Sequence, residues 1–403
     1  MNRIAYLLVG SALICSAPAL AGEEPLYQPA PDWVEEASLP ADTSGPPILL
    51  FDDQRLIEEG QLSSYIDRAI RIDNPQMLSA VGTLQAAWLP DKGDLVIHRI
   101  EIIRDGEEKD LLAGGAKFEV LRRERQLEQR MLDGSYTATM SVPGLRVGDI
   151  LRLSYTITTS DQALDKEVQA LAALPAKPFE ARSARVRMSW PDDAPVKWQL
   201  SAKDIEPELT EHDGVTSIEV ALPLPEQDEV PVDAPVRYRL PPMLQAGTFS
   251  SWKEVSEIMA PLYSTEGAIA PGGAIARQVA SIEDEYDKPL ERAVAALRTV
   301  QDEIAYLLNG MDGGNYIPQT PAETWEKRYG DCKAKTMLLL AMLREMGIDA
   351  EPVVVASQTG DAVPEMLPMP AAFDHVIVHA VIDGTDYWLD GTNSGASMAV
   401  VNE

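Results

Sequence analysis

Cys332 follows Asp331, a favoured N-cap residue, and precedes an apolar run that stops before Gly347. We therefore expect a helix that begins at the cysteine, because Asp caps helix starts and Gly is common just after helix ends. The unpaired backbone N–H groups and the positive dipole end of the first turn favour an anion at this position. Lys333 and Lys335 add positive charge, although Asp331 opposes it. These features predict a cysteine that reacts as a thiolate nucleophile.

A thiol nucleophile also needs a nearby imidazole, and the chain contains only four histidines. His98 and His212 lie in the first half of the chain, where each is most simply a strand or surface residue. His375 and His379 both fall on a predicted strand over residues 373–382, and their even spacing places them on the same side of it. These two histidines are therefore the candidate partners of the cysteine.

The Asp-Gly turn at residues 383–384 distinguishes the two histidines. If it is a two-residue hairpin turn, the next strand pairs back in a fixed register. His375 then has Asp390 as its diagonal neighbour on the same face, roughly 7–8 Å away between backbone positions, whereas His379 faces Trp388. A carboxylate within reach would orient the imidazole and stabilise its cation. The register predicts His375 and Asp390 as the partners of the nucleophile.

A metal site does not suit these two histidines. Residues four apart in a strand are separated by roughly 13 Å, whereas two nitrogens that share one zinc ion each lie about 2 Å from it. We therefore expect no metal and no other cofactor.

Residues 1–21 have the features of a secretory signal peptide: Arg3, an apolar stretch from Ile4 to Cys15, and a small-residue cleavage site at the end. We expect a periplasmic or secreted protein. The apolar stretch is short for a spanning helix, and no later run approaches roughly 20 apolar residues, so no stable membrane insertion is expected. Cleavage removes Cys15, which leaves Cys332 as the only thiol and excludes an internal disulfide.

The formal net charge of −30 bears on the choice of partner. Such a surface repels phosphate backbones and anionic lipids, so a nucleic-acid partner is excluded. The acidic residues are scattered and identify no substrate. Without the signal peptide the chain has roughly 380 residues, enough for two or three domains with their own cores.

The patterning changes along the chain. Residues 22–47 form a Pro-rich leader, because prolines interrupt any regular element. Residues 48–240 show short alternating runs separated by turn dipeptides such as Asp105-Gly106, which predict an antiparallel β-sandwich, with a helix over Gln54 to Ile70. A stretch with many prolines, 223–242, crosses to the next domain.

From residue 247 to 403 the hydrophobic period becomes helical. Helices are predicted from about Ser251, over 273–284 and over 289–304, followed by the helix at the cysteine. Strands are then predicted over 351–356, 373–382 and 387–390. The second half is therefore an α+β domain in which the cysteine helix packs on an antiparallel sheet.

Four sequence blocks resemble successive blocks of the transglutaminase-like superfamily. They are Tyr329-Gly-Asp-Cys-Lys-Ala-Lys-Thr336, Met346-Gly-Ile-Asp-Ala-Glu-Pro-Val-Val-Val355, Phe373-Asp-His-Val-Ile-Val378 and Tyr387-Trp-Leu-Asp-Gly-Thr392. Upstream, Pro143-Gly-Leu-Arg-Val-Gly-Asp149 resembles the DUF3857 domain that precedes such domains in bacterial exported proteins. The resemblance implies a papain-like Cys-His-Asp arrangement that transfers or hydrolyses acyl groups on amides without a metal. It also implies further strands beyond the end of this sequence.

The expected activity is hydrolysis of peptide, protein or cell-wall amides through a thioester at Cys332. Two alternatives stay open: transfer of the acyl group to an amine, and a binding or scaffold protein that retains the triad without turnover. An oxyanion donor is required, and the Cys332 backbone N–H is the leading candidate. Tyr306, Trp325 and Tyr329 are nearby side chains with a structural rather than a catalytic interpretation.

Overall fold

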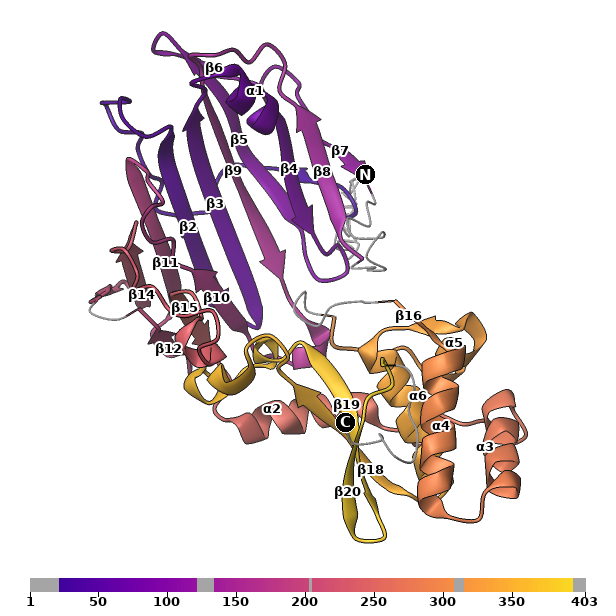
Figure 1. Ribbon diagram of the computed structural model, residues 1–403. Coiled ribbons are helices and arrows are strands. Elements are labelled where there is room, and N and C mark those ends of the chain that lie inside the picture. Colours follow the sequence, from indigo (N-terminus) through magenta and orange to yellow (C-terminus); the bar gives the residue numbers. More distant parts are fainter. Residues whose placement is uncertain (1–21, 122–133, 203–204, 308–314, 394–403) are drawn as a thin grey trace, which may run out of the picture.

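The structure is a computed structural model that describes residues 22–121, 134–202, 205–307 and 315–393. The predicted signal peptide, residues 1–21, and the last ten residues of the predicted 247–403 domain lie outside the described residues. A β part built from residues before 248 is followed by an α+β part, shown as the upper and lower parts of Figure 1.

One nine-stranded sheet forms the frame of the β part. Its strands lie in the order β1-β5-β9-β3-β2-β11-β14-β13, and β6 pairs with β5. All pairings are antiparallel except β1 with β5 and β2 with β11, which are parallel. The strands are β1 (Leu26–Tyr27), β2 (Ile48–Glu58), β3 (Gln61–Arg71), β5 (Leu95–Arg104), β6 (Glu107–Asp110), β9 (Ile150–Thr159), β11 (Ser183–Pro191), β13 (Glu208–His212) and β14 (Val215–Ala221).

Two three-stranded sheets pack on this frame and make the predicted β-sandwich. The first has the order β4-β8-β7, and the second has the order β10-β15-β12. Each shares a buried apolar core with the large sheet. The strands are β4 (Thr83–Trp88), β7 (Glu119–Leu121), β8 (Tyr136–Ser141), β10 (Gln169–Ala173), β12 (Lys197–Leu200) and β15 (Met243–Gly247), and a short helix α1 (Pro75–Val81) precedes β4.

The helix predicted over Gln54 to Ile70 is wrong, because this segment forms the β2–β3 hairpin. Glu59 and Gly60 make the turn, with φ angles of 49° and 77°. The alternation of apolar and polar residues was hidden because buried positions hold polar side chains. One example is Asp67, which is fully buried and paired with Arg152 at 2.7 Å.

The segment predicted as a leader, residues 22–47, lies against the β part. Its strand β1 pairs with β5, and Ala37 and Leu39 pack on a small apolar cluster around Leu50. Glu35 adds an ion pair to Arg187 at 2.9 Å.

Five helices and one three-stranded sheet form most of the described α+β part. The sheet order is β18-β19-β20, all antiparallel, and the short strands β16 and β17 pair in parallel. These elements are α2 (Trp252–Met259), α3 (Ala274–Glu285), α4 (Pro289–Glu303), β16 (Ala305–Tyr306), α5 (Pro321–Lys327), β17 (Tyr329–Gly330), α6 (Cys332–Glu345), β18 (Asp349–Val355), β19 (His375–Ile382) and β20 (Thr385–Leu389). Short 3₁₀ helices occur at Gln162–Leu164, Val236–Tyr238, Ala260–Tyr263, Gly360–Glu365 and Pro370–Ala372.

Helix α6 is the centre of the second part. Every residue from Cys332 to Leu343 is buried, because α4 and α5 pack on one side of α6 and the sheet on the other. Thr336 fixes the helix to the sheet, since its hydroxyl donates to the Val376 carbonyl at 3.0 Å. Within the described residues no helix is long and apolar enough to cross a membrane.

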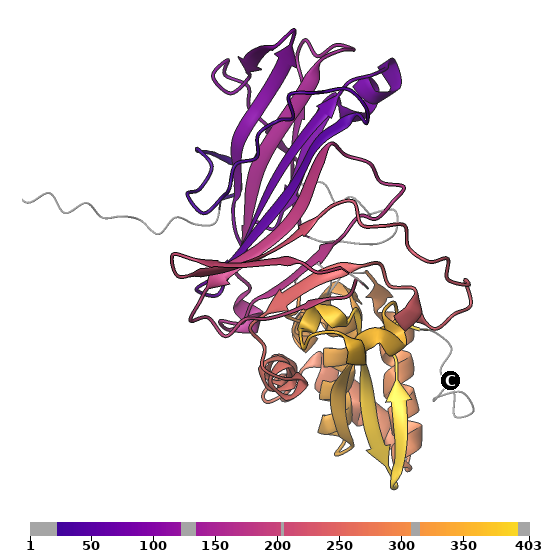
Figure 2. The same cartoon turned by 90° about the vertical axis from the view of Figure 1, so that its left-hand side faces the viewer.

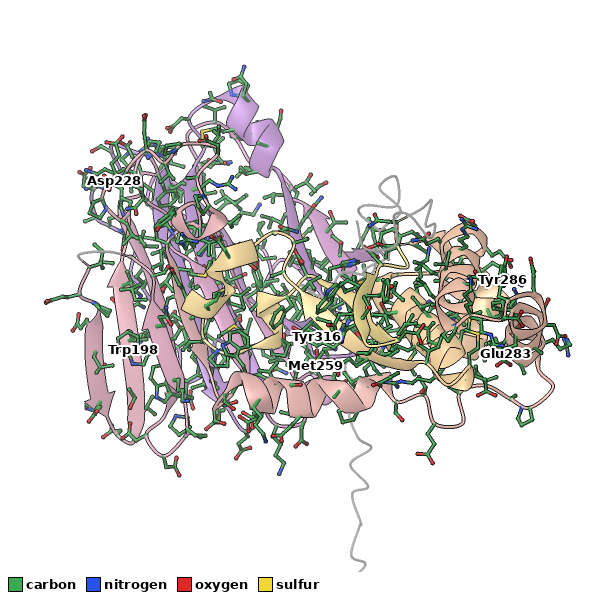
Figure 3. All side chains as sticks on the ribbon, turned by 60° about the horizontal axis from the view of Figure 1, so that its bottom comes forward. Trp198, Asp228, Met259, Glu283, Tyr286 and Tyr316 are labelled. Carbon is green, nitrogen blue, oxygen red and sulfur yellow. The ribbon has the colours of Figure 1, made fainter. Side chains whose placement is uncertain are left out.

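The two parts meet at the segment that leads into β19 (Figure 2). Gln169 of β10 accepts a hydrogen bond from the Ala371 backbone at 2.9 Å and donates one to the Tyr316 hydroxyl at 2.6 Å. Gln245 of β15 accepts from the Leu367 backbone at 3.0 Å. Tyr316, labelled in Figure 3, is fully buried. The β part therefore supports the chain just before His375.

Candidate active site

Asp331 makes the start of α6 suitable for a nucleophile. One carboxylate oxygen accepts from the Ala334 N–H at 2.9 Å, which caps the helix as predicted. The other oxygen pairs with the ammonium of Lys333, whose side chain is only 1% exposed. The negative charge that opposed a thiolate in the sequence is therefore neutralised by a buried partner. Cys332 is the first helical residue and is itself 1% exposed.

Gly330 allows the chain to enter α6 at close range. A Cβ atom at this position would lie 2.5 Å from the Ala334 Cβ, which is far inside normal contact. The approach is steric, because the Gly330 backbone does not have a positive φ angle. It sets where the N-terminus of α6 stands relative to β17.

Gly330→Ala is expected to destabilise the protein by about 1–3 kcal/mol, because the added methyl group overpacks a buried contact. Urea unfolding measures the change. Ala334→Gly supplies the control: in the double variant the clash is gone, so the two losses should not add. Strict additivity would show that the Gly330–Ala334 contact does not set the entry to the helix.

The hairpin β19–β20 has the predicted register. Ile382 pairs with Thr385 across the Asp383-Gly384 turn. His379 lies opposite Trp388, and their rings stack with centroids 4.6 Å apart.

The same register brings the other predicted partners together. His375, the first residue of β19, has its Nε2 atom 3.1 Å from Oδ2 of Asp390, which follows β20 directly. Asp390 is held by three further donors, namely the Thr392 backbone at 2.8 Å, the Thr392 hydroxyl at 2.7 Å and the Asn393 amide at 3.1 Å.

His375 also interacts with Cys332. Burial disfavours the imidazolium, but hydrogen bonds and negative charge from Asp390 and Cys332 outweigh it and raise the pKa of His375 to about 10. Because Asp390 engages Nε2, Nδ1 is the ring nitrogen left for the sulfur. The structure thus brings Cys332, His375 and Asp390 into one cluster.

The remaining histidines lie elsewhere. His379 is placed between Glu351 at 3.0 Å and Asp386 at 2.8 Å, and these two carboxylates raise its pKa. His98 contacts the Gln28 carbonyl and a threonine in the β part, and His212 is the exposed last residue of β13. Within residues 22–121, 134–202, 205–307 and 315–393, no group of three His, Cys, Asp or Glu side chains could hold a metal ion.

Lys335 departs from its expected place. It was expected to add charge beside the cysteine, yet its ammonium is buried and donates to the Ile304 carbonyl at 2.7 Å. Burial lowers the pKa of Lys335 to about 8, against the opposing charges of Asp390 and Asp302. The lysine therefore ties α6 to the end of α4.

Of the three aromatic candidates, Tyr306 is the one that interacts with the cluster. Burial and the charges of Cys332, Asp331 and Asp390 raise its pKa. Trp325 is covered by the Arg328 guanidinium, and Tyr329 lies in β17.

Sequence reasoning missed Tyr263. Burial, followed by the charge of Cys332, raises the pKa of its hydroxyl. The apolar face of α2 continues to this residue at helical spacing, from Val255 through Met259, but the spacing does not reveal what lies opposite.

Two families match the chain. Residues 58–222 match the "Domain of Unknown Function with solved-structure structure (DUF3857)", and residues 274–390 match the "Transglutaminase-like superfamily". The second match runs from α3 to Asp390 and includes Cys332 and His375. No significant match is found among curated proteins.

Among solved structures, the chain is similar to a "putative protease" from Parabacteroides distasonis ATCC 8503, with 17% identity and a TM-score of 0.64. The match covers 85% of this chain and 66%, just under two thirds, of that protein, and at this identity it supports the fold alone. An M1 zinc metallopeptidase from Deinococcus radiodurans also aligns, with 14% identity over 50% of this chain and 41% of that one, but its TM-score of 0.25 supports no comparison. The chain therefore contains a DUF3857 domain, residues 58–222, followed by a domain of the transglutaminase-like superfamily, residues 274–390.

Proposed function

We propose that the protein is an exported cysteine enzyme that hydrolyses amide bonds through a thioester, with Cys332 as nucleophile and His375 and Asp390 as its partners. The observation that supports this most is the position of His375, whose Nε2 atom lies 3.1 Å from Asp390 and whose pKa is raised by its interactions with both Asp390 and Cys332, the first residue of a helix. This is the arrangement of a nucleophile, a base and an orienting group that activated thiols use.

In the proposed cycle the Cys332 sulfur attacks the carbonyl carbon of an amide, and the carbonyl oxygen takes up negative charge. Collapse of this intermediate breaks the C–N bond, and the His375 imidazolium gives its proton to the leaving amine. Water then attacks the thioester while His375 removes a proton from it. Cleavage of the C–S bond releases the acid and restores the thiolate, so no step needs a metal or another cofactor.

The backbone N–H of Cys332 is the proposed oxyanion donor. The first N–H groups of a helix have no partner within the helix, so this N–H can donate to an oxyanion that forms at the sulfur. The Asp331 carboxylate is already committed to Ala334 and Lys333, so it does not compete for this N–H.

The proposed substrates are peptide, protein or cell-wall amides in the periplasm or outside the cell. Two features of the sequence support this setting: the signal-like residues 1–21, and the net charge of −30, which disfavours nucleic acid. Transfer to an amine differs from hydrolysis only in the group that attacks the thioester. Incubation with a glutamine peptide and a labelled primary amine separates the two, since hydrolysis releases acid and labels nothing.

The pH dependence of thiol alkylation tests the proposal, because residues 22–403 contain one cysteine. Iodoacetamide should react with the native protein at pH 6 on the order of 10² times faster than with His375→Ala, in which the sulfur reacts like an ordinary thiol of pKa near 8.5. The rate of the variant should rise with pH and approach the native rate above pH 9.

His379→Ala is the matched control for this experiment. It removes a histidine from the same face of β19 that contacts two carboxylates rather than the thiol. Its alkylation profile should follow the native one. A native thiol that reacts no faster at pH 6 than the His375→Ala thiol would rule out the proposed enzyme and favour a binding or scaffold role.

A further inference from the structure

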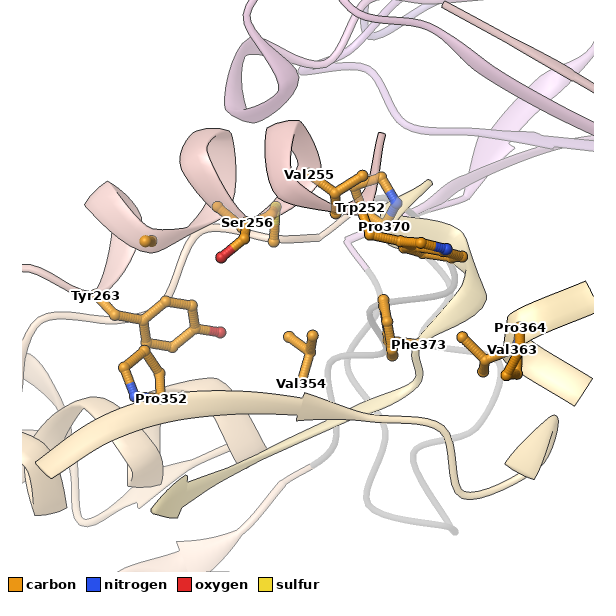
Figure 4. Close-up of a pocket in the computed structure, with 12 residues that line it drawn as sticks. Trp252, Val255, Ser256, Tyr263, Pro352, Val354, Val363, Pro364, Pro370 and Phe373 are labelled. Atoms are coloured by element: carbon orange, nitrogen blue, oxygen red, sulfur yellow. The ribbon is translucent and has the colours of Figure 1, made fainter. Parts of the chain in front are cut away.

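An apolar cavity of about 480 Å³ lies between helix α2 with its following turn and the outer strand β18. Figure 4 shows side chains from both walls converging on it. The side chains that define its character are Trp252, Val255, Met259, Tyr263, Val354 and Phe373. Its size and apolar lining are those of a ligand pocket rather than of a packing defect.

Tyr263 connects this cavity to the cysteine. The tyrosine is 2% exposed, and its hydroxyl, which points into the cavity in Figure 4, has no hydrogen-bond partner within the described residues. The same hydroxyl is close enough to Cys332 to respond to the charge of the sulfur. At the other end of the cavity, Phe373 stands two residues before His375. Tyr263 belongs to the same buried core cluster as Cys332, so two lining residues place the cavity next to the elements that carry the proposed thiol–imidazole pair.

We propose that this cavity binds a large apolar side chain of the acyl part of the substrate, an aromatic one above all, and that the Tyr263 hydroxyl donates to the carbonyl oxygen of the same residue. The inference rests on the proposed amide hydrolysis and specifies its substrate class. It predicts preferred cleavage of peptides that carry Phe, Tyr, Trp or Leu close to the scissile amide.

A peptide residue fits the cavity better than a lipid chain because of the unpaired hydroxyl. Buried hydroxyl groups are nearly always hydrogen-bonded, and an alkyl chain would leave the Tyr263 hydroxyl without a partner. A peptide residue brings both the apolar side chain that the walls suit and the carbonyl that the hydroxyl lacks. The neighbouring wall of α2 adds a second hydroxyl, that of Ser256.

The test uses three peptidyl chloromethyl ketones, N-acetyl-Phe-Gly, N-acetyl-Gly-Phe and N-acetyl-Gly-Gly, in which the Cys332 sulfur displaces chloride and forms a thioether. Each second-order rate is divided by the iodoacetamide rate of the same protein. The normalised rate of at least one Phe reagent should exceed that of the Gly-Gly reagent by more than tenfold, and this ratio is the aromatic preference of the protein. Two Phe reagents that are no faster than the Gly-Gly reagent would overturn the proposal.

Two variants place the preference in the cavity. Ser256 is exposed on α2 and lines the cavity, so Ser256→Trp fills the space without a change in the core, and the preference should fall below about threefold. Glu257→Trp, at the next exposed position, adds the same side chain outside the cavity and should keep the preference. Tyr263→Phe should lower the preference for the Phe reagents several-fold. An octyl chloroacetamide that reacts faster than both Phe reagents, equally in native protein and Tyr263→Phe, would instead identify a lipid-chain site.

A binding measurement separates this inference from the proposed catalysis. In Cys332→Ser, saturation-transfer NMR should detect N-acetyl-phenylalaninamide but not N-acetylglycinamide, and Ser256→Trp should abolish the signal. If Cys332→Ser binds the aromatic amide but the thiol of the native protein is inert, the proposed binding site stands and the proposed amide hydrolysis is rejected. An active thiol with no aromatic binding and no reagent preference would reject the cavity alone.

Discussion

Asp331→Ala is expected to destabilise the protein by about 3–5 kcal/mol, one of the two largest effects that the structure predicts. The substitution removes the cap on the Ala334 N–H, which contributes about 1 kcal/mol. It also leaves the Lys333 ammonium buried without its carboxylate, which is the larger loss. Equilibrium unfolding in urea measures the total loss of unfolding free energy. In the molecules that stay folded, the first turn of α6 should fray, so that Cys332 loses its reactivity.

Two further variants distinguish the buried ion pair from the cap. Asp331→Ala combined with Lys333→Met removes both charges, and most of the loss should be recovered, with about 1 kcal/mol left for the cap. Asp374→Ala is the control, because Asp374 likewise accepts from backbone N–H groups, in this case those of Ser357 and Gln358, but has no buried lysine partner. It should lose about 1 kcal/mol. A double variant as unstable as Asp331→Ala would show that Lys333 is not responsible.

The pairing of His375 with Asp390 could be predicted because it depends on local chemistry. The Asp383-Gly384 turn has φ angles of 49° and 77°, as a two-residue hairpin requires, and such a turn fixes the register of both strands. Side chains alternate strictly along a strand, so register alone decides which residues share a face. The start of α6 was predictable for a similar reason, since a cap residue and a following glycine mark both ends of the helix.

Other features could not be predicted because they depend on contacts between distant segments. Residues 54–70 were mistaken for a helix because a buried position of the hairpin holds Asp67, whose partner Arg152 comes from β9. Asp52, just before this segment, is buried against Arg185 of β11. Lys333 was expected to add positive charge beside the cysteine, but it is buried and paired with Asp331. The support that Gln169 gives to the segment before His375 spans two domains, so no local pattern records it.

Asp390→Ala is expected to remove a pH-dependent contribution to stability of at most about 4 kcal/mol, because Asp390 and Cys332 together raise the pKa of His375. The raised pKa of His375, about 10, contributes stability that is fully present below pH 6.5 and is lost as the pH rises through 10. Burial acts to raise the pKa of Asp390, but its hydrogen bonds with His375 and Thr392 outweigh burial and lower this pKa. The contribution of Asp390 to stability is therefore present above about pH 4 and is lost as the pH falls through the lowered pKa. The pair therefore stabilises the protein most between about pH 4 and 6.5.

Urea unfolding of native protein and Asp390→Ala at pH 5.5 and pH 10 measures this contribution. The difference in unfolding free energy should be largest at pH 5.5 and fall below about 1 kcal/mol at pH 10, where His375 is losing its charge. Asp386→Ala is the matched control, because it removes an exposed carboxylate from the other histidine of the same strand, His379, and should change stability by less than about 0.5 kcal/mol at either pH. An equal loss at pH 5.5 and pH 10 for Asp390→Ala would mean that Asp390 only fixes the end of β20. A loss confined to the acidic side would instead link stability and the proposed chemistry through one charge, because the imidazolium that Asp390 holds in place is also the proposed partner of the Cys332 sulfur.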